Sequence, residues 1–312
     1  MRSPLPIALL TALTLALAAC GGGSDDEDSA ATPATTPAAA EPQRPIIGIG
    51  EQGAAMFSDR RFARLGIEHV RLVVPYDAMR RRIERDLATV WIAEARRTGS
   101  EPFITFGHSR ETPEKLPSVS EYTSAVRSFR RMFPDVQVFA PWNEINHDSQ
   151  PTSDAPRRAA QYYNVLKEEC PRCVVLAGDV LDQRGMVRYL ETYRRSLEGE
   201  PEIWGLHNYS DTNRFRSTGL REMLATVKGE IWLTETGGLV QFGRNFPRDE
   251  ERAARATAYA IKQAREHERV GRIYLYNWTG TDPKARFDAG LIAPDGTPRP
   301  AFDVLREALE ER

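Results

Sequence analysis

The chain has 312 residues, of which 42 are Lys or Arg and 44 are Asp or Glu, so its formal net charge is −2 at pH 7. This balance gives no electrostatic reason to expect nucleic-acid binding, because proteins that bind nucleic acids present clustered basic charge. We expect the one basic run, Arg80-Arg81-Arg82, to be the exposed face of a helix.

Residues 1–20 have the pattern of a bacterial lipoprotein signal. Arg2 gives the positive start, and the apolar stretch at 7–17 is too short to span a bilayer. Residues 17–20 resemble a lipobox that ends in Cys20. We therefore expect export, cleavage before Cys20, and a lipid on that cysteine as the only attachment to a cell membrane. The alternative is an ordinary secretory signal that happens to end in Cys.

Residues 21–44 are mostly Gly, Ser, Asp, Ala, Thr and Pro. A segment with so few large apolar side chains cannot bury enough surface to offset its ordering entropy, so we expect a disordered tether. The remaining residues, 45–312, are then a single catalytic domain, which we expect to be monomeric.

Residues 45–312 alternate apolar, β-rich runs with amphipathic helical patterns. The strand-like runs are Ile46–Gly50, His69–Val74, Pro102–Gly107, Gln137–Trp142, Val174–Gly178, Ile203–His207, Glu230–Thr234 and Arg272–Asn277. The helical patterns are Ser58–Leu65, Ala78–Thr98, Val119–Phe133, Ala155–Glu169, Met186–Leu197, Thr218–Val227, Asp249–Glu268 and Ala301–Glu310. Nearly continuous apolar strands suit a parallel sheet that is buried on both faces.

Eight strands alternating with eight helices predict an α/β fold of the (β/α)8 TIM-barrel type. An open doubly wound sheet is the alternative. It is disfavoured because Gly48-Ile49-Gly50 lacks the third glycine of a phosphate-binding turn and is followed by Glu51. Catalytic residues of a barrel lie where its strands end, so the strand ends indicate the site.

Two carboxylates follow apolar strands. Glu144 comes after the predicted fourth strand, and Glu235 comes at the end of the seventh. These strands face each other across a barrel mouth, so both side chains can reach one cleft. A pair of carboxyl groups suits glycoside cleavage, in which one protonates the leaving oxygen and the other attacks the sugar or activates water. We expect the proton donor to have a raised pKa, for example through repulsion from the other carboxylate.

Trp142-Asn143-Glu144 and Thr234-Glu235 resemble the signatures of clan-A glycoside hydrolases, the retaining β-glycosidases built on a (β/α)8 barrel. The resemblance implies that Glu144 is the general acid/base and Glu235 the nucleophile. It also implies that Asn143 binds the 2-hydroxyl of the sugar. Ile145 departs from the family pattern, in which Pro often follows the strand-four Glu, so we expect a different loop on the leaving-group side.

Other strand ends extend the resemblance. Arg71 matches an arginine that keeps the nucleophile ionised, and His108 matches a histidine that binds sugar hydroxyls. His207-Asn208-Tyr209 resembles a His-x-Tyr motif in which the tyrosine donates to the nucleophile, and the resemblance implies that His207 and Tyr209 contribute to sugar binding. Trp278 matches the aromatic floor of the sugar subsite.

Further polar residues near the strand ends remain open from the sequence. Asp179 and Asp182 could line the cleft, and Asn208 and Asp211 could reach substrate, whereas His69 is expected to be structural. The loops after the strands are short. A short-looped, open cleft suits internal attack on a polymer better than trimming of chain ends.

Cys170 and Cys173 lie in the segment Cys170-Pro171-Arg172-Cys173. A local disulfide, a reduced pair and a redox-active pair are all possible, but a redox pair normally opens a helix. No second Cys or His pair completes a zinc site, so we expect no metal and no organic cofactor.

The sequence therefore predicts a lipid-anchored, extracytoplasmic, retaining glycoside hydrolase that acts on a β-linked polysaccharide or oligosaccharide. One alternative is a non-catalytic carbohydrate-binding lipoprotein on the same barrel. Another is a barrel enzyme of a different class, such as a polysaccharide lyase or a metal-dependent hydrolase.

Overall fold

The computed structural model describes residues 44–311. The predicted signal, the predicted tether and Cys20, the predicted site of lipidation, lie outside these residues, apart from residue 44 at the end of the predicted tether. Within the described part of the chain, no helix is both long enough and apolar enough to cross a membrane.

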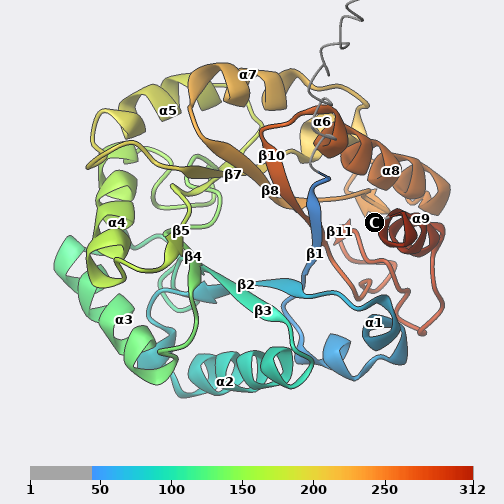
Figure 1. Cartoon of the computed structure of the whole chain (residues 1–312), viewed down its shortest axis with the longest axis horizontal. Helices are drawn as coiled ribbons and strands as arrows, with labels where there is room; N and C mark the ends of the chain where they lie inside the picture. The colour runs from blue at the N-terminus through green and yellow to red at the C-terminus, as the bar shows by residue number, and fades with distance from the viewer. Residues whose placement is uncertain (1–43, 312) are drawn as a thin grey trace, which may run out of the picture. The chain divides into compact units, whose positions relative to one another are not determined.

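Parallel strands form a ring, and helices surround it (Figure 1). The order of hydrogen-bonded strands is β5-β4-β3-β2-β1-β10-β8-β7-β6. The strands are β1 (Ile46–Gly50), β2 (His69–Pro75), β3 (Glu101–Gly107), β4 (Val138–Ala140), β5 (Val174–Val175), β6 (Asp179–Leu181), β7 (Ile203–His207), β8 (Glu230–Thr236) and β10 (Val270–Tyr276). The predicted (β/α)8 barrel is confirmed.

The predicted fifth strand, Val174–Gly178, is a strand only at β5, and a second short strand, β6, follows the predicted range. β5 pairs with β4, and β6 pairs with β7. Between them, the N–H of Leu176 donates to the carbonyl of Phe139 and the N–H of Ala177 donates to that of Ile203, each over 2.9 Å. The chain thus passes from one neighbour to the other, and this crossing closes the barrel.

The bend after β5 depends on Gly178. Its φ of 136° is a conformation that side chains with a Cβ rarely adopt, and an added Cβ would lie 3.1 Å from the side chain of Ile145. The bend starts β6 one residue later, at Asp179.

The outer layer contains α1 (Arg60–Leu65), α2 (Arg82–Arg97), α3 (Val119–Met132), α4 (Pro156–Glu169), α5 (Met186–Arg194), α6 (Tyr209–Asn213), α7 (Thr218–Thr226), α8 (Glu250–Glu266) and α9 (Pro300–Glu310). Ser118 and Glu121 form a reciprocal capping box at the start of α3. The pattern from 78 to 98 is interrupted at Arg81, which has extended backbone between the 3-10 helix η2 (Ala78–Arg80) and α2.

Several short elements were not predicted from the sequence. They are α6, the 3-10 helix η1 (Ala54–Ser58) and an antiparallel pair formed by β9 (Gln241–Phe242) and β11 (Phe287–Asp288). Each has five residues or fewer, which is too short to show a periodic apolar pattern.

Aromatic and aliphatic side chains fill the barrel interior. Basic and acidic side chains contact one another at the N-terminal end of the strands. Phe103, Trp232 and Tyr274 belong to the interior cluster. The guanidinium of Arg272 lies 4.1 Å from the ring centre of Trp232 and donates to Glu101 over 2.8 Å. His69 contacts the same Glu101 carboxylate at 2.9 Å, as expected for a structural histidine.

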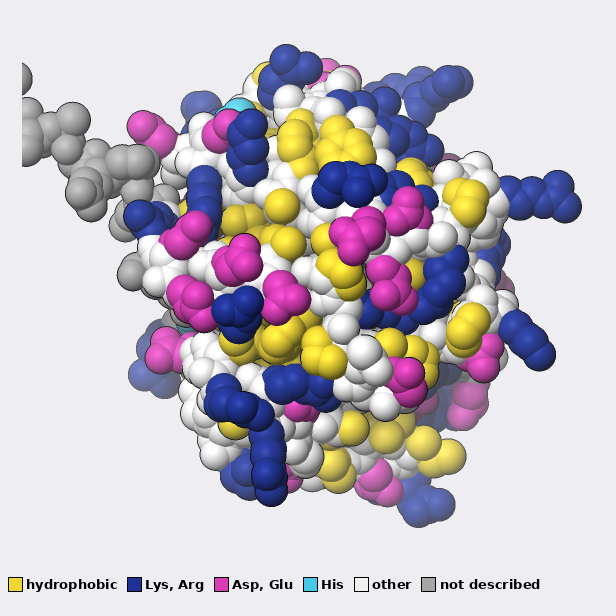
Figure 2. All heavy atoms as spheres, turned by 90° about the vertical axis from the view of Figure 1, so that its right-hand side faces the viewer, with side chains coloured by type: hydrophobic (Ala, Val, Ile, Leu, Met, Phe, Trp, Pro, Cys, Tyr) yellow, Lys and Arg dark blue, Asp and Glu magenta, His cyan; other side chains and the backbone are white. Residues whose placement is uncertain are grey.

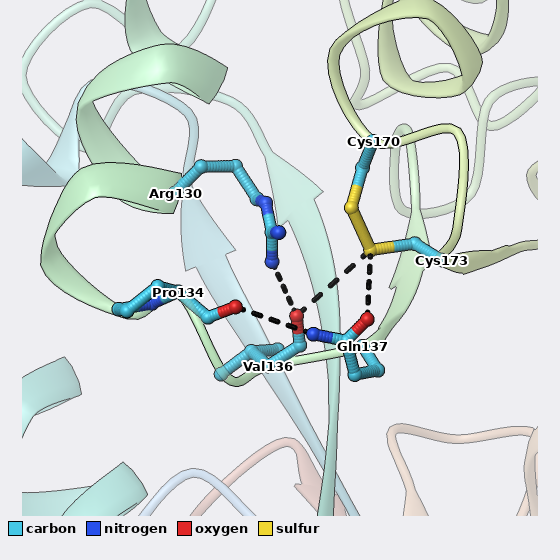
Figure 3. The surroundings of a disulfide bond; sticks show 6 residues. All are labelled: Arg130, Pro134, Val136, Gln137, Cys170 and Cys173. Carbon is cyan, nitrogen blue, oxygen red and sulfur yellow. Dashed lines mark hydrogen bonds between the residues drawn. A yellow bond between two sulfur atoms is a disulfide. The ribbon is translucent and has the colours of Figure 1, made fainter.

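A disulfide joins Cys170 to Cys173 in the turn between α4 and β5 (Figure 3). The Sγ of Cys173 lies 3.6 Å from Oε1 of Gln137 and 3.9 Å from the carbonyl oxygen of Val136. The turn precedes β5, so the disulfide lies at the N-terminal side of the strands, opposite their C-terminal ends.

Figure 2 shows the face of the molecule that carries α8 and α9. Basic and acidic side chains are interspersed there with small apolar areas. Mixed charge of this kind provides no single-sign field on this face.

Candidate active site

Glu144 lies in a tight turn directly after β4. The N–H of Asn143 donates to the carbonyl of Phe106 over 2.7 Å, and the N–H of Ile145 donates to that of Asp179 over 2.9 Å. Glu144 has a φ of 48°, in the left-handed region. Such a conformation at a residue other than glycine costs on the order of 1–3 kcal/mol and is concentrated at functional sites.

Glu235 lies near the end of β8, and both of its carboxylate oxygens have partners. Oε2 accepts a hydrogen bond from the Arg71 guanidinium over 2.8 Å, and Oε1 accepts one from the Tyr209 hydroxyl over 3.2 Å. The predicted links of Arg71 and Tyr209 to this carboxylate are therefore present in the geometry.

Arg71 is fully buried and donates hydrogen bonds to residues at the ends of both β4 and β8. Besides Glu235, it donates to Oδ1 of Asn143 over 2.8 Å and to Asp179 over 2.7 Å. Burial opposes its charge, but the carboxylates of Asp179 and Glu235 outweigh that effect and raise the pKa of Arg71 further. Because Arg71 occupies Oδ1 of Asn143, the amide nitrogen of Asn143 is the group left to donate to a ligand.

Asp179 is a central residue of the site. From the sequence, we had considered it only as a possible lining residue of the cleft. It is fully buried under the strand ends, where its second oxygen accepts from Thr234 over 2.7 Å. Burial would raise the pKa of Asp179, but the charge of Arg71 and contact with His207 hold it well below its usual value. The sequence showed only that Asp179 directly follows the predicted fifth strand. It did not show the bend at Gly178 that turns the Asp179 side chain inward.

His207 is fully buried beside Glu144 rather than lining the cleft, so its predicted role in binding sugar is corrected. Its Nδ1 lies 3.2 Å from Oε1 of Glu144, and its Nε2 lies 3.3 Å from the Arg71 guanidinium. Burial lowers the pKa of His207, but Glu235, Asp179 and Glu144 together raise it to about 9.

The pKa of Glu144 is lowered, contrary to the raised value that we expected. Burial alone would raise it, but the hydrogen bond from His207 and the nearby charges of His207, His147 and Arg71 shift it below its ordinary value. In the resting protein, the proton of the His207–Glu144 pair is therefore held by His207.

Two cavities share Glu144 and Glu235 in their walls. The small cavity, of about 260 Å³, is also lined by Asn143, His108 and Tyr276. The large cavity, of about 550 Å³, extends over Tyr209 and the loops after β6, β7 and β8. His108 thus lies where a sugar in the small cavity could reach it.

Trp278 does not lie in either cavity, so its predicted role as an aromatic floor is corrected. Only 2% of its surface is exposed. Its ring packs edge-to-face against Phe62 of α1 and Phe302 of α9, and its indole N–H donates to Asp59 over 3.2 Å. The aromatic residue that lines the small cavity is Tyr276, two positions earlier, at the end of β10.

The other polar candidates divide between core and cavity. Asn208 and Asp211 are buried, and Asp211 accepts from the backbone N–H of Leu220 over 2.9 Å. Asp182 lines the large cavity and accepts from the backbone N–H groups of Ser210 and Asp211. Among residues 44–311, no group of three or more His, Cys, Asp or Glu side chains is arranged to hold a metal ion.

A family model described as glycosyl hydrolase catalytic core matches residues 114–304, which is more than half of the chain. The chain therefore belongs to the glycosyl hydrolase catalytic core family. The predicted resemblance to glycoside hydrolases on a (β/α)8 barrel is confirmed by this match. A comparison with curated proteins found no match.

Solved structures of glycoside hydrolases share the fold. A family 39 glycoside hydrolase from Bacteroides cellulosilyticus WH2 matches with a TM-score of 0.59 at 14% identity, over 85% of this chain and 64% of that one. A GH5_18 protein from Bifidobacterium longum subsp. infantis matches with 0.63 at 15% identity, over 86% and 79%. Xylanase 10B from Thermotoga maritima matches with 0.59 at 12% identity, over 86% and 95%. This chain thus spans less than two thirds of the family 39 protein.

Proposed function

We propose that the protein is a retaining glycoside hydrolase that cleaves β-linked oligosaccharides or polysaccharides through a covalent glycosyl-enzyme intermediate. The observation that carries the proposal is the unequal setting of two carboxylates on shared cavity walls. Glu235 is held by a buried arginine and a tyrosine hydroxyl, whereas Glu144 contacts a histidine that can supply a proton.

Glu235 is the nucleophile in this mechanism. Its carboxylate attacks the anomeric carbon while the bond from that carbon to the leaving oxygen breaks. The positive charge of Arg71, 2.8 Å away, favours the ionised carboxylate that this attack requires.

Glu144 is the general acid and then the general base. The proton passes from Nδ1 of His207 to Oε1 of Glu144, across their 3.2 Å contact, and then to the leaving oxygen. A substrate that displaces water from the cavities favours this transfer, because an ion pair is disfavoured relative to its neutral form in a drier site. In the second step, Glu144 takes a proton from water as the water oxygen attacks the anomeric carbon and releases Glu235.

Loss of either carboxylate should abolish hydrolysis while the barrel remains folded. We expect Glu235→Ala and Glu144→Gln each to lower kcat by at least about 10³-fold, because each removes a group that acts directly at the reacting atoms. An activated 2-fluoro glycoside should label Glu235 in the wild-type protein, as intact mass and peptide mapping would measure.

Glu222→Gln is the matched control, because Glu222 is an exposed carboxylate on α7. It should retain full activity. Undiminished hydrolysis by Glu235→Ala would contradict the assignment. Hydrolysis without a covalent adduct and with inversion of the anomeric carbon, seen by NMR, would replace retention by inversion. Binding without any hydrolysis would instead support a carbohydrate-binding protein.

We further propose that the substrate is reached outside the cytoplasm by a protein anchored through a lipid on Cys20. The supporting features are the sequence pattern of residues 1–20 and the tether-like composition of residues 21–44. The loops between β4 and α4 (141–155) and between β10 and α9 (277–299) are longer than we expected, so loop length gives no support for action within a polymer rather than at its ends.

A further inference from the structure

The large cavity beside the two carboxylates contains an unusual set of basic side chains. Arg184, Arg214 and Arg216 line it together with Glu144 and Glu235. They come from the segment after β6 and from the segment between α6 and α7, so two separate parts of the chain bring positive charge to one wall.

Within residues 44–311, two of these arginines have no anionic partner. Arg216 donates to Ser210 over 2.7 Å and lies 3.4 Å from Asp211. In contrast, no carboxylate oxygen within residues 44–311 lies within 4.0 Å of the guanidinium nitrogens of Arg184 or Arg214. Their charges are therefore available to a ligand that enters the cavity.

The acidic groups of the same wall already have partners. Glu235 is paired with Arg71, and Glu144 contacts His207. Asp182 accepts two backbone hydrogen bonds, and burial raises the pKa of Asp182 to about 7, so its negative charge is reduced near neutral pH. The cavity thus offers more unpaired positive than unpaired negative charge.

Aromatic side chains also line the cavity. Phe242, Phe246 and Phe287 line the cavity, and the guanidinium of Arg214 lies 5.1 Å from the ring centre of Phe246. Aromatic faces suit the apolar C–H face of a sugar ring. A guanidinium held beside them provides a planar pair of donors that matches a carboxylate.

We propose that the large cavity binds a uronosyl residue, a sugar that carries a carboxylate, next to the bond that is cleaved. Its ring lies against the phenylalanines, and its carboxylate is bound by Arg184 and Arg214. This assignment of substrate class rests on the proposed glycoside hydrolase function.

The test uses matched β-linked oligosaccharides that are neutral, carboxylated at C6 or sulfated at O6, on glucan and mannan backbones. Binding to the full domain with the Glu235→Ala change is measured by titration calorimetry, so that no substrate is consumed. We expect at least one carboxylated oligosaccharide to bind about 10-fold or more tightly than its neutral counterpart, because charged hydrogen bonds are the stronger class. The preference should weaken as salt is added.

In the Arg184→Gln/Arg214→Gln background, the carboxylate preference should fall by about 10-fold while binding of the neutral oligosaccharide changes less than about 2-fold. Arg255→Gln is the control, because Arg255 is an exposed arginine on the outer helix α8. It should leave the preference unchanged.

The proposal is overturned if no carboxylated oligosaccharide binds more tightly than its neutral counterpart, if sulfated sugars alone are preferred, or if the double variant keeps the preference. Labelling of the wild-type protein by the 2-fluoro glycoside separates this outcome from failure of the proposed function. Labelling without carboxylate preference removes only the uronosyl assignment. Carboxylate preference without labelling or hydrolysis removes the hydrolase and keeps the binding site.

Discussion

At the scale of single residues, the site depends on the hydrogen bonds that the buried Arg71 guanidinium donates to its acceptors. Arg71 contacts Glu235, Asn143 and Asp179, and it lies beside His207. Asp179 offsets the positive charges of Arg71 and His207 from below the cavities. A third carboxylate therefore contributes to the electrostatics of Glu144 and Glu235, the pair that we propose reacts with substrate.

The protonation of His207 predicts how activity depends on pH. Its folded-state pKa of about 9 lies above the ordinary value of 6.5. The proton is therefore present below about pH 9 and is lost as the pH rises through that value. Since Glu144 receives this proton in the proposed mechanism, we expect kcat/KM to fall through about pH 9, which a pH–rate profile would measure.

Asp179→Asn tests the contribution of the buried carboxylate. Removing its negative charge should lower the pKa of His207, so the alkaline limb of kcat/KM should move to lower pH. The same linkage applies to stability: the raised His207 pKa stabilises the wild-type fold fully below about pH 6.5, and this contribution disappears by about pH 9. Urea unfolding should show a smaller change across this window in Asp179→Asn. An unshifted limb would rule out the electrostatic role.

At the scale of elements, the bend between β5 and β6 couples barrel closure to the site. Gly178 permits the bend, and Asp179 follows directly. Gly178 thereby allows the chain to pair with β4 before the bend and with β7 after it. The same bend turns the Asp179 carboxylate toward Arg71.

Gly178→Ala should lower the free energy of unfolding by about 1–3 kcal/mol, because its positive φ and the approach of Ile145 both oppose a Cβ. It should also lower kcat by displacing Asp179. Chemical denaturation and steady-state kinetics measure these effects.

Gly99→Ala is the matched control for this change. Gly99 also has a positive φ, of 77°, but an added Cβ would meet no atom within 4 Å. It should lose stability and retain kcat. If Gly178→Ala also retained kcat, Gly178 would affect stability alone.

The elements also show what the sequence could and could not predict. Apolar runs placed eight of the barrel strands, because this signal is local, but they did not place β6, which begins after the predicted fifth strand. The inward turn of Asp179 and the burial of Trp278 depend on contacts with distant segments. Tyr276 rather than Trp278 lines the cavity because the last strand ends at Tyr276, a boundary that residue type alone does not fix.

At the scale of the whole molecule, the catalytic barrel is proposed to be attached to a membrane through Cys20. Cys20→Ser should release the protein from the membrane fraction of a cell that processes lipoproteins, because the lipid can no longer be attached. Fractionation and metabolic labelling with a fatty-acid analogue measure this.

The control is the double variant Cys170→Ser/Cys173→Ser. Its cysteines are joined to each other in the turn before β5, so it should remain in the membrane fraction and retain the label. Membrane association of Cys20→Ser at the wild-type level would refute the anchor.

The group formed by Arg272, Trp232, Glu101 and His69 at the N-terminal end of the strands has a consequence for how the protein can change. These contacts stabilise the barrel at the end opposite the loops that would recognise sugars. Exchange of those loops therefore leaves the contacts at the N-terminal end of the strands intact. The chain can acquire a preference for another glycan by altering the loops after β6, β7 and β8, without rebuilding the interactions that keep it folded.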